Sequence, residues 1–433
     1  MSEGKFKFTR EEKSWMMYDW ANSAHSIVVV TILPIFFMSL FEDNTSAVAT
    51  WGSVTSASKF IVALLAPLMG TLGDFKDMKK RLLALFLTIG VMACLGLSGM
   101  PFSPKWQLIL GLYALSNIGF AGANIFYDGF LPEVTTHERM DRVSAWGFGL
   151  GYIGGSTIPF IIFLVLFMTI SANMAMAISF ALTGVWWGVF SLPLLKNVKQ
   201  IHYVERKKGM VLDSLRQLST TVKDIYHNKT MLFFLLAYFF YIDGVNTIIY
   251  MSTAYGSALH IDGTQMMLAL LMVQILAFPF ALLYGHLAGK FGTSRMIWVG
   301  ILIYTGICVF GFFVRETWHF WVLAALVATS QGGVQALSRS LFGKMIPNRE
   351  RSNEFFGFFE IFGKFSAIMG PWLFGFSTLK AAEFIRSRQP EISQMELDRS
   401  AAPFGVFSVL IIFVFGAIFF ALYNKQSKRH VNN

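Results

Sequence analysis

Carboxylate and amide side chains recur inside long apolar segments of this sequence. Asp19 and Asn22 lie three positions apart in the apolar stretch 15–40, and Asp243 and Asn246 repeat that spacing in a second apolar stretch. Residues three or four positions apart share one face of a helix. A carboxylate inside a bilayer costs roughly 2.5 kcal/mol or more unless it faces a partner or a water-filled cavity. These residues therefore indicate a polar surface inside a membrane.

Two further apolar stretches carry polar stripes of the same kind. The stripe on 106–131 comprises Tyr113, Asn117, Asn124 and Asp128, and the stripe on 318–343 comprises Gln331, Gln335, Ser338 and Arg339. Any one stripe has an alternative explanation, because polar side chains also form hydrogen bonds between helices in membranes. Four such stripes together favour an aqueous path through the protein.

Asp243 is a candidate for carrying a proton. It lies about thirteen positions into its apolar stretch, which places it near the middle of a bilayer at about 1.5 Å per residue. Burial there disfavours the charged form, so this carboxylate could take up and release a proton as its surroundings change. Asp19 is the second candidate, because it is the related carboxylate of the other stretch. In the alternative interpretation, Lys364 or another cation holds Asp243 ionised, and Asp243 is a member of a structural ion pair.

A frame of membrane-spanning helices is needed to position these residues. Of 433 residues, 55% are hydrophobic and 14% charged, against about 25% charged in soluble domains. An apolar run of about 20 residues spans the ~30 Å hydrocarbon core of a bilayer as a helix. Such runs occupy 15–40, 47–72, 82–100, 106–131, 143–170, 175–195, 230–256, 264–288, 294–313, 318–343, 355–379 and 402–424. We therefore predict an all-α integral membrane protein with twelve transmembrane helices.

The distribution of Lys and Arg predicts the orientation. Most of the 35 basic residues fall on one side if both termini are cytoplasmic, as the positive-inside rule requires, and the outer side then has one long loop, 380–401. The segment 210–228 has a partial apolar stripe, and we predict an amphipathic helix on the inner membrane surface. The excess of positive charge is then expected to meet anionic lipid headgroups rather than nucleic acid. No cleavable signal peptide is visible in the N-terminal segment.

The two halves of the sequence repeat each other. The Asp-x-x-Asn pattern recurs as described above, Gly70 corresponds to Gly285, and Pro132 corresponds to Pro347. Parallel six-helix repeats are the organisation of major facilitator transporters. We therefore expect two pseudo-symmetric six-helix bundles, 1–195 and 230–433, joined by a cytoplasmic linker, 196–229. In that fold the four polar stripes occupy the helices that line the central cavity.

The segment GTLGDFKDMKKR, which begins at Gly70, resembles the loop signature of the major facilitator superfamily. Gly70 would permit close helix packing, and Asp74 would sit against a helix N-terminus across the halves. We predict that both residues belong to a gate together with Arg339, which would meet Asp128 or Asp19 when the cavity is closed to the inside. The alternative is an ordinary positively charged inner loop.

Other features argue against catalysis and cofactors. The run GFGLGYIGG, 147–155, contains a formal dinucleotide-binding pattern, but it lies inside an apolar span, so we interpret its glycines as a surface for close helix packing. Cys94 and Cys308 both lie in apolar runs, which argues against a disulfide or a Cys-based metal site. We predict no enzymatic activity, no catalytic residues, no cofactor and no metal.

Several blocks resemble one branch of the major facilitator superfamily. The blocks YDWANS (18–23), FLPE (130–133), RVSAWGFGLGYIGG (142–155), QALSRSLFGKMIP (335–347) and EFFGFFEIFGKFSAIMGP (354–371) resemble signatures of vacuole-effluxer-like permeases. The resemblance implies a secondary active transporter that works by alternating access and exports small polar metabolites such as amino acids. The short loops favour a bacterial plasma-membrane member over a vacuolar one. We expect a monomer whose partners are the lipid bilayer, a small-molecule substrate and, through Asp243, protons. Another cargo (a sugar, a peptide or a drug) and a non-transporting membrane receptor or enzyme are the alternatives.

Overall fold

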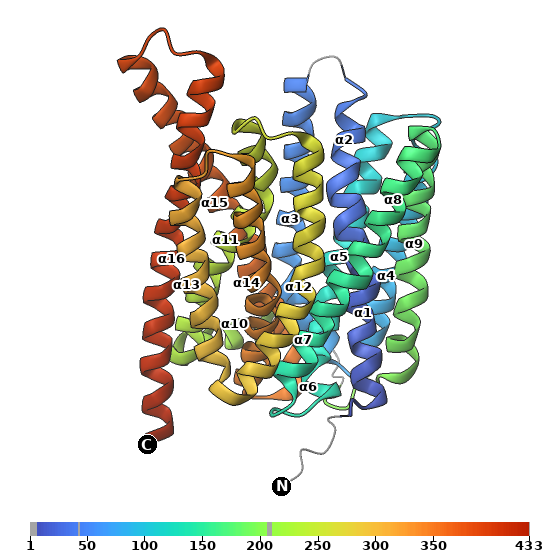
Figure 1. The fold of residues 1–433 in the computed structure, drawn as a ribbon. Helices are drawn as coiled ribbons and strands as arrows, with labels where there is room; N and C mark the ends of the chain where they lie inside the picture. The colour runs from blue at the N-terminus through green and yellow to red at the C-terminus, as the bar shows by residue number, and fades with distance from the viewer. Residues whose placement is uncertain (1–6, 42–43, 206–209, 433) are drawn as a thin grey trace. The chain divides into compact units, whose positions relative to one another are not determined.

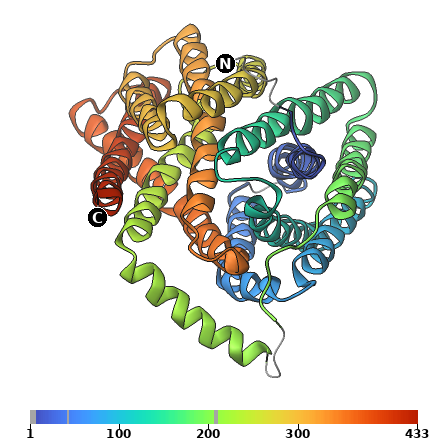
Figure 2. The same ribbon diagram turned by 90° about the horizontal axis from the view of Figure 1, so that it is seen from below.

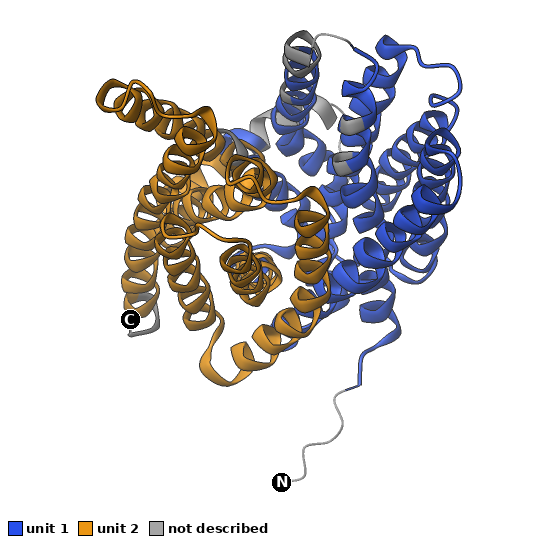
Figure 3. Ribbon diagram, turned by 45° about the horizontal axis from the view of Figure 1, so that its top comes forward, with its two compact units in different colours: residues 1–220, 343–361 blue, residues 221–342, 362–433 orange. Residues whose placement is uncertain are grey.

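The computed structural model describes residues 7–41, 44–205 and 210–432, and within these ranges the chain is helical (Figure 1). Apart from helices and turns, the described residues contain an isolated parallel bridge between Phe75 and Val204. The chain divides into two compact units, coloured separately in Figure 3. Unit 1 comprises residues 1–220 and 343–361, and unit 2 comprises 221–342 and 362–433.

Unit 1 is built from the first half of the chain. Its helices are α1 (Arg10–Ile27), the π-helix η1 (Val28–Ile32), α2 (Leu33–Met38), α3 (Asn44–Asp74), α4 (Met78–Leu97), α5 (Trp106–Gly129), α6 (Leu131–Val134), α7 (Met140–Leu150), the π-helix η2 (Gly151–Thr157), α8 (Ile158–Thr169) and α9 (Ala172–Asn197). The 3₁₀ turn η3 (Arg349–Arg351) also belongs to unit 1. α1 packs against α7, η2 and α9, and Figure 2 shows it enclosed by other helices of its unit.

Unit 2 is built from the second half of the chain. Its helices are α11 (Lys229–Ala258), α12 (Gly263–Phe291), α13 (Thr293–Phe312), most of α14 (Thr317–Met345), most of α15 (Ser352–Arg388) and α16 (Gln394–Asn432). The linker helix α10 (Met210–His227) contributes residues to both units. The ends of α14 and α15 that flank η3 are assigned to unit 1. The division into bundles at 195 and 229 stays a prediction, as does the position of α10 on a membrane surface.

Ten helical segments among the described residues are long and apolar enough to cross a membrane, and some of them combine consecutive helices. They are 50–74, 78–97, 106–134, 140–169, 172–197, 229–258, 263–291, 293–312, 317–345 and 394–429. Each overlaps one of the predicted runs. The two remaining predicted runs, 15–40 and 355–379, coincide with the consecutive helices α1, η1 and α2 and with α15. The all-helical membrane fold predicted from apolar length is therefore confirmed.

Two of the predicted spans are not regular α-helices. The π-helical turn η1 interrupts the first span, and η2 interrupts the fifth span between α7 and α8. Glycines of η2 lie against α1: a Cβ on Gly151 would approach Ser23 Oγ to 2.6 Å, and one on Gly155 would approach Trp20 O to 2.5 Å. This confirms the close-packing interpretation for these two glycines, which belong to the run that contains the formal dinucleotide-binding pattern.

The predicted long outer loop, 380–401, is largely helical. α15 continues to Arg388 and α16 begins at Gln394, so only a short turn separates the two helices. The prediction treated charged residues as the end of a span, but charged side chains end a membrane crossing without ending a helix. Charged side chains of 380–401 stabilise the helical extensions. Lys380 pairs with Glu383 at 2.6 Å within α15, and Arg399 of α16 donates to Leu259 O at the end of α11.

The start of α1 is held by a buried carboxylate. Thr9 and Glu12 form a capping box, and Glu12 also accepts hydrogen bonds from Thr135 Oγ1 (2.7 Å) and from Arg139 (2.6 and 2.7 Å). Burial opposes ionisation of Glu12, but the hydrogen bonds from Arg139, Thr135 and Thr9 outweigh it and lower its pKa. The carboxylate therefore stabilises the fold in its charged form.

We expect Glu12→Gln to destabilise the protein by about 1–3 kcal/mol near neutral pH, because charge-assisted hydrogen bonds to a buried group are lost. The folded-state pKa of Glu12 is lowered below its ordinary value of 4.5, so its contribution is complete above that pH and disappears as the pH falls through the lowered value. Thermal unfolding of both proteins should therefore differ at pH 7 and converge at acid pH. Glu11→Gln, an exposed change on the same turn, is the control. A difference that persists unchanged at acid pH would contradict this assignment.

Candidate functional site

In unit 1 the polar faces of α1 and α5 meet. Asn22 Nδ2 donates a hydrogen bond to Asn124 Oδ1 at 2.9 Å, which joins two of the predicted site residues across these helices. Asp19 and Asp128, on the same two helices, are both buried. A second contact fixes how α1 and α5 are aligned. Trp15 Nε1 donates to Tyr127 O at 2.8 Å, and the rings of Trp15 and Tyr127 stack.

Asn117 is not brought into this contact. Its Nδ2 donates to Tyr113 O, 3.1 Å away and one turn back on its own helix. The Tyr113 hydroxyl accepts a hydrogen bond from Thr55 on α3 at 3.2 Å. The predicted stripe on α5 is therefore divided, with Asn124 bonded to α1 and the opposite end bonded within α5 and to α3.

Asp243 is fully buried in unit 2 and lies against the backbone of α15. Its Oδ1 accepts a hydrogen bond from the Gly370 amide at 3.0 Å, so its partner is a backbone group and not the side chain of Lys364. Its Oδ2 has no hydrogen-bond partner among the described residues. Thr247, one turn further along α11, is also fully buried, and its hydroxyl likewise has none there.

Gly370 is needed for this contact. A Cβ at this position would collide with Thr247 Oγ1 and would lie 2.9 Å from Asp243 Oδ1, so α11 and α15 approach each other here with no room for a side chain. Sequence reasoning missed Gly370 as a partner of Asp243. The available signal was a glycine followed by Pro371 inside an apolar span, because proline removes a backbone donor and small residues permit close helix packing.

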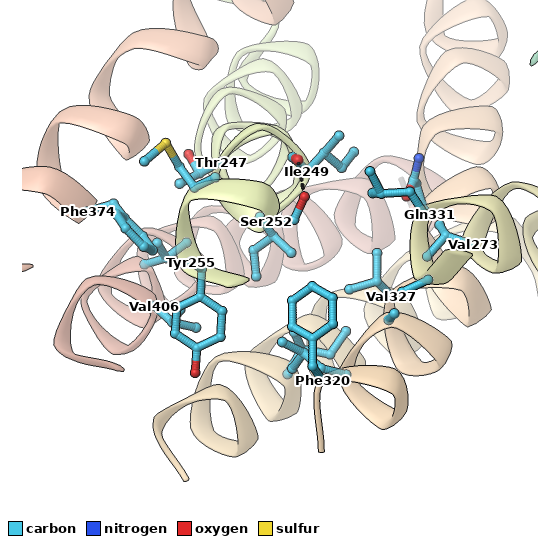
Figure 4. Close-up of a pocket in the computed structure, with 18 of the residues that line it drawn as sticks. Thr247, Ile249, Ser252, Tyr255, Val273, Phe320, Val327, Gln331, Phe374 and Val406 are labelled. Atoms are coloured by element: carbon cyan, nitrogen blue, oxygen red, sulfur yellow. Dashed lines mark hydrogen bonds between the residues drawn. The ribbon is translucent and has the colours of Figure 1, made fainter. Parts of the chain in front are cut away.

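The remaining predicted residues of unit 2 lie on α11 and α14. Gln331 and Arg339 are buried, whereas Asn246 and Gln335 are half-buried. Two tyrosine hydroxyls hold α14 in place, through the bonds Tyr241–Ser338 (2.6 Å, from α11) and Tyr284–Ser330 (2.9 Å, from α12). Gln331 lines a pocket of unit 2 (Figure 4). The carboxylates predicted to meet Arg339 belong to unit 1, so that pairing stays a prediction.

Asp74 sits against a helix N-terminus, as the loop signature led us to expect. Its two carboxylate oxygens accept the backbone amides of Asn353 (2.9 Å) and Glu354 (3.0 Å) in the first turn of α15. These amides have no partner within their own helix, and a negative charge is favoured at a helix N-terminus. Gly70, one turn earlier on α3, packs on the same segment, where a Cβ would collide with Asn353 O. A role of Gly70 and Asp74 in gating stays a prediction.

A buried ion pair between Lys79 and Glu133 lies beside this contact, and sequence reasoning missed it. Lys79 Nζ also donates to Gly129 O (3.1 Å) and to Ser352 Oγ (3.0 Å). Both charged residues were part of motifs noted in the sequence, but Lys79 was interpreted only as a loop charge. We name this region the loop junction, defined as residues 73–79, 129–133, 200–204 and 352–354.

The start of the linker forms hydrogen bonds to the loop that follows α3. Gln200 Nε2 donates to Gly73 O at 3.1 Å. The backbone amide of Val204 donates to Asp74 O (2.8 Å), and the amide of Lys76 donates back to Val204 O (3.2 Å), which together form the isolated bridge noted above. The loop after α3, the end of α5, the start of the linker and the first turn of α15 are therefore held together within unit 1.

The polar groups described above bond to one another or to backbone groups of neighbouring helices. Buried amides and carboxylates lie on helices whose backbones approach closely at glycines. Among the described residues, no group of three or more His, Cys, Asp or Glu side chains is placed to hold a metal ion.

Comparisons with known proteins agree with this fold. The family model described as "Vacuole effluxer Atg22 like" matches residues 45–381. The MFS-type transporter YxiO of Bacillus subtilis is 43% identical over 98% of this chain and 97% of that protein. Autophagy-related protein 22 of Saccharomyces cerevisiae is 23% identical over 81% of this chain and 76% of that protein. Among solved structures, the major facilitator proton:xylose symporter XylE superposes with a TM-score of 0.66 at 12% identity, covering 95% of this chain and 93% of that one.

Proposed function

Because the chain belongs to the vacuole effluxer Atg22-like family of major facilitator transporters, we propose that it exports small polar metabolites, amino acids foremost, by proton-coupled alternating access. The chain is a multi-pass membrane protein whose partners are a small-molecule substrate and the lipid bilayer. Its family and fold are those of transporters, which are not enzymes. We further propose that it acts as a monomer in the cell membrane, with both termini in the cytoplasm.

Two buried polar surfaces carry the proposal, one on α1 and α5 in unit 1 and one on α11 in unit 2. The amide pair of Asn22 and Asn124 and the carboxylate of Asp243 lie in spans that are otherwise apolar, where polar groups are costly. Such groups are retained where a polar solute or a proton must pass. In the major facilitator organisation, substrate and coupling-ion sites lie near the middle of the bilayer, where the repeats meet.

The loop junction supports alternating access. Asp74 and Gly70 hold the first turn of α15, and α15 also carries Gly370, the partner of Asp243. One helix therefore connects the proposed gate residues to the proposed coupling residue. A transporter needs such a connection, because opening the gate has to change the surroundings of the proton site.

Exchange across liposome membranes tests the cargo. Purified protein would first be screened for thermal stabilisation by amino acids, sugars, dipeptides and cationic drugs, and each stabilising compound would then be tested for exchange in its radiolabelled form. We expect an amino acid to exchange at least tenfold faster than in protein-free liposomes. Exchange of a sugar, a dipeptide or a drug, with none of any amino acid, would contradict the proposed cargo.

A further inference from the structure

Unit 2 contains a pocket within its own set of helices. Residues of α11, α12 and α14 form most of its walls, and α13, α15 and α16 complete it (Figure 4). The pocket has a cavity volume of about 80 Å³ and is open at its mouth, so a slender chain can enter it. It shares Gln331 with the predicted cavity face of α14 and Thr247 with the face of α11 that carries Asp243.

The walls are apolar and uncharged. Val273, Phe320, Val327 and Phe374 are representative, and the described residues that line the pocket include no charged side chain. A charged ligand would lose its water here without gaining a counter-ion, which is strongly unfavourable. The pocket therefore selects against ions and zwitterions, unlike the polar faces proposed for the metabolite cargo.

Two polar groups in the lining lack a partner. Gln274 Oε1 and Thr247 Oγ1 are buried without a hydrogen bond to any described residue. Two other hydroxyls of the lining already form hydrogen bonds within the protein. Ser252 Oγ donates to a carbonyl oxygen one turn back on α11 (2.8 Å), and Tyr255 Oη donates to Gly311 O (2.6 Å). A buried acceptor without a donor is costly, so the amide oxygen of Gln274 favours a ligand that brings an O–H or N–H.

We propose that this pocket is a binding site for an uncharged amphiphile, a molecule with an apolar body and a hydroxyl or amide donor at one end. The body packs against the apolar side chains of α12 and α14, and the donor reaches Gln274 Oε1, with Thr247 as a second hydrogen-bonding group. The proposal concerns a ligand of a different class from the polar cargo and does not rest on the proposed function.

Photolabelling tests the site directly. The full chain in lipid nanodiscs would be labelled with octanol that carries a diazirine, and the labelled residues would be mapped by mass spectrometry. We expect saturable labelling of the lining residues of α11, α12 and α14. Unlabelled octanol should compete, whereas octane and octyl sulfate, which lack the donor or carry a charge, should compete at least tenfold less well. Labelling that does not saturate, or competition by octane equal to that by octanol, would overturn the proposal.

Two variants and one control test separately the hydrogen bond to Gln274 and the space between the apolar walls. Gln274→Leu keeps a side chain of similar size and removes the acceptor, so the affinity for octanol should fall about tenfold, the usual effect of one lost hydrogen bond. Gln265→Leu, on the same helix but outside the pocket, is the matched control, because it also removes an amide acceptor, that of Trp321 Nε1 on α14 (3.1 Å); this variant should bind as the wild type does. Ala324→Trp should fill the pocket and abolish saturable labelling. Equal binding by Gln274→Leu and Gln265→Leu would contradict the proposed role of Gln274, whether or not Ala324→Trp folds.

Discussion

An Asp243→Asn protein is expected to exchange cargo across liposome membranes at close to the wild-type rate and to lose accumulation driven by a pH gradient. Asparagine keeps the shape of the side chain and an oxygen that can accept the Gly370 amide, so the contact between α11 and α15 is preserved. It cannot take up or release a proton. Radiolabelled cargo would be followed in both assays with the same preparation.

The control for this variant is Asp398→Asn, a carboxylate near the start of α16 that accepts a hydrogen bond from Gln394. This protein should retain both exchange and accumulation. Loss of both activities in Asp243→Asn, together with lower thermal stability, would show a structural role for the carboxylate. Normal accumulation in Asp243→Asn would remove this residue from the coupling mechanism.

Asp74→Asn is expected to lower the unfolding temperature by several degrees and to slow exchange at least fivefold. The amide keeps one acceptor oxygen, so one of the two α15 backbone amides loses its partner, and the charge at the helix N-terminus disappears. The lost bond costs about 1–3 kcal/mol, and the lost charge adds about 0.3–1 kcal/mol. The measurements are thermal unfolding in detergent and initial exchange rates in liposomes.

Asp77→Asn makes the same chemical change three residues away on an exposed side chain. We expect it to change stability by no more than about 0.5 kcal/mol, as is usual for surface positions. If Asp74→Asn were as stable and as active as Asp77→Asn, the contact with α15 would have no part in the transport cycle.

The membrane spans could be predicted from sequence because apolar length alone determines them. The stretch that became α5 and the stretch that became α11 were bounded to within a few residues, and so were most others. The length of an apolar run does not show whether the helix contains a π-helical turn, so η1 and η2 were not predicted. Nor does it reveal where a helix ends outside the bilayer, so the helical extension of α15 to Arg388 was missed.

The polar residues could be found from sequence, but most of their partners could not. Asn22 and Asn124 were both singled out, and the structure joins them. Gly370, the partner of Asp243, carries no polar side chain and so leaves no signal in a search for polar residues. The ion pair at the loop junction depends on two segments that meet only in the folded chain. Spacing along one helix predicts a shared face, whereas contacts between helices depend on packing.

Accumulation of cargo against its gradient by the wild-type protein tests the central claim, proton-coupled secondary transport, most directly. Liposomes containing the purified chain would be prepared with equal cargo inside and outside, and a pH gradient would then be imposed. Export by exchange moves protons down their gradient and cargo the opposite way. We therefore predict that cargo concentrates severalfold on the more acidic side and that a protonophore abolishes the effect. Equal concentrations on both sides, with exchange still rapid, would contradict the account and show a passive facilitator.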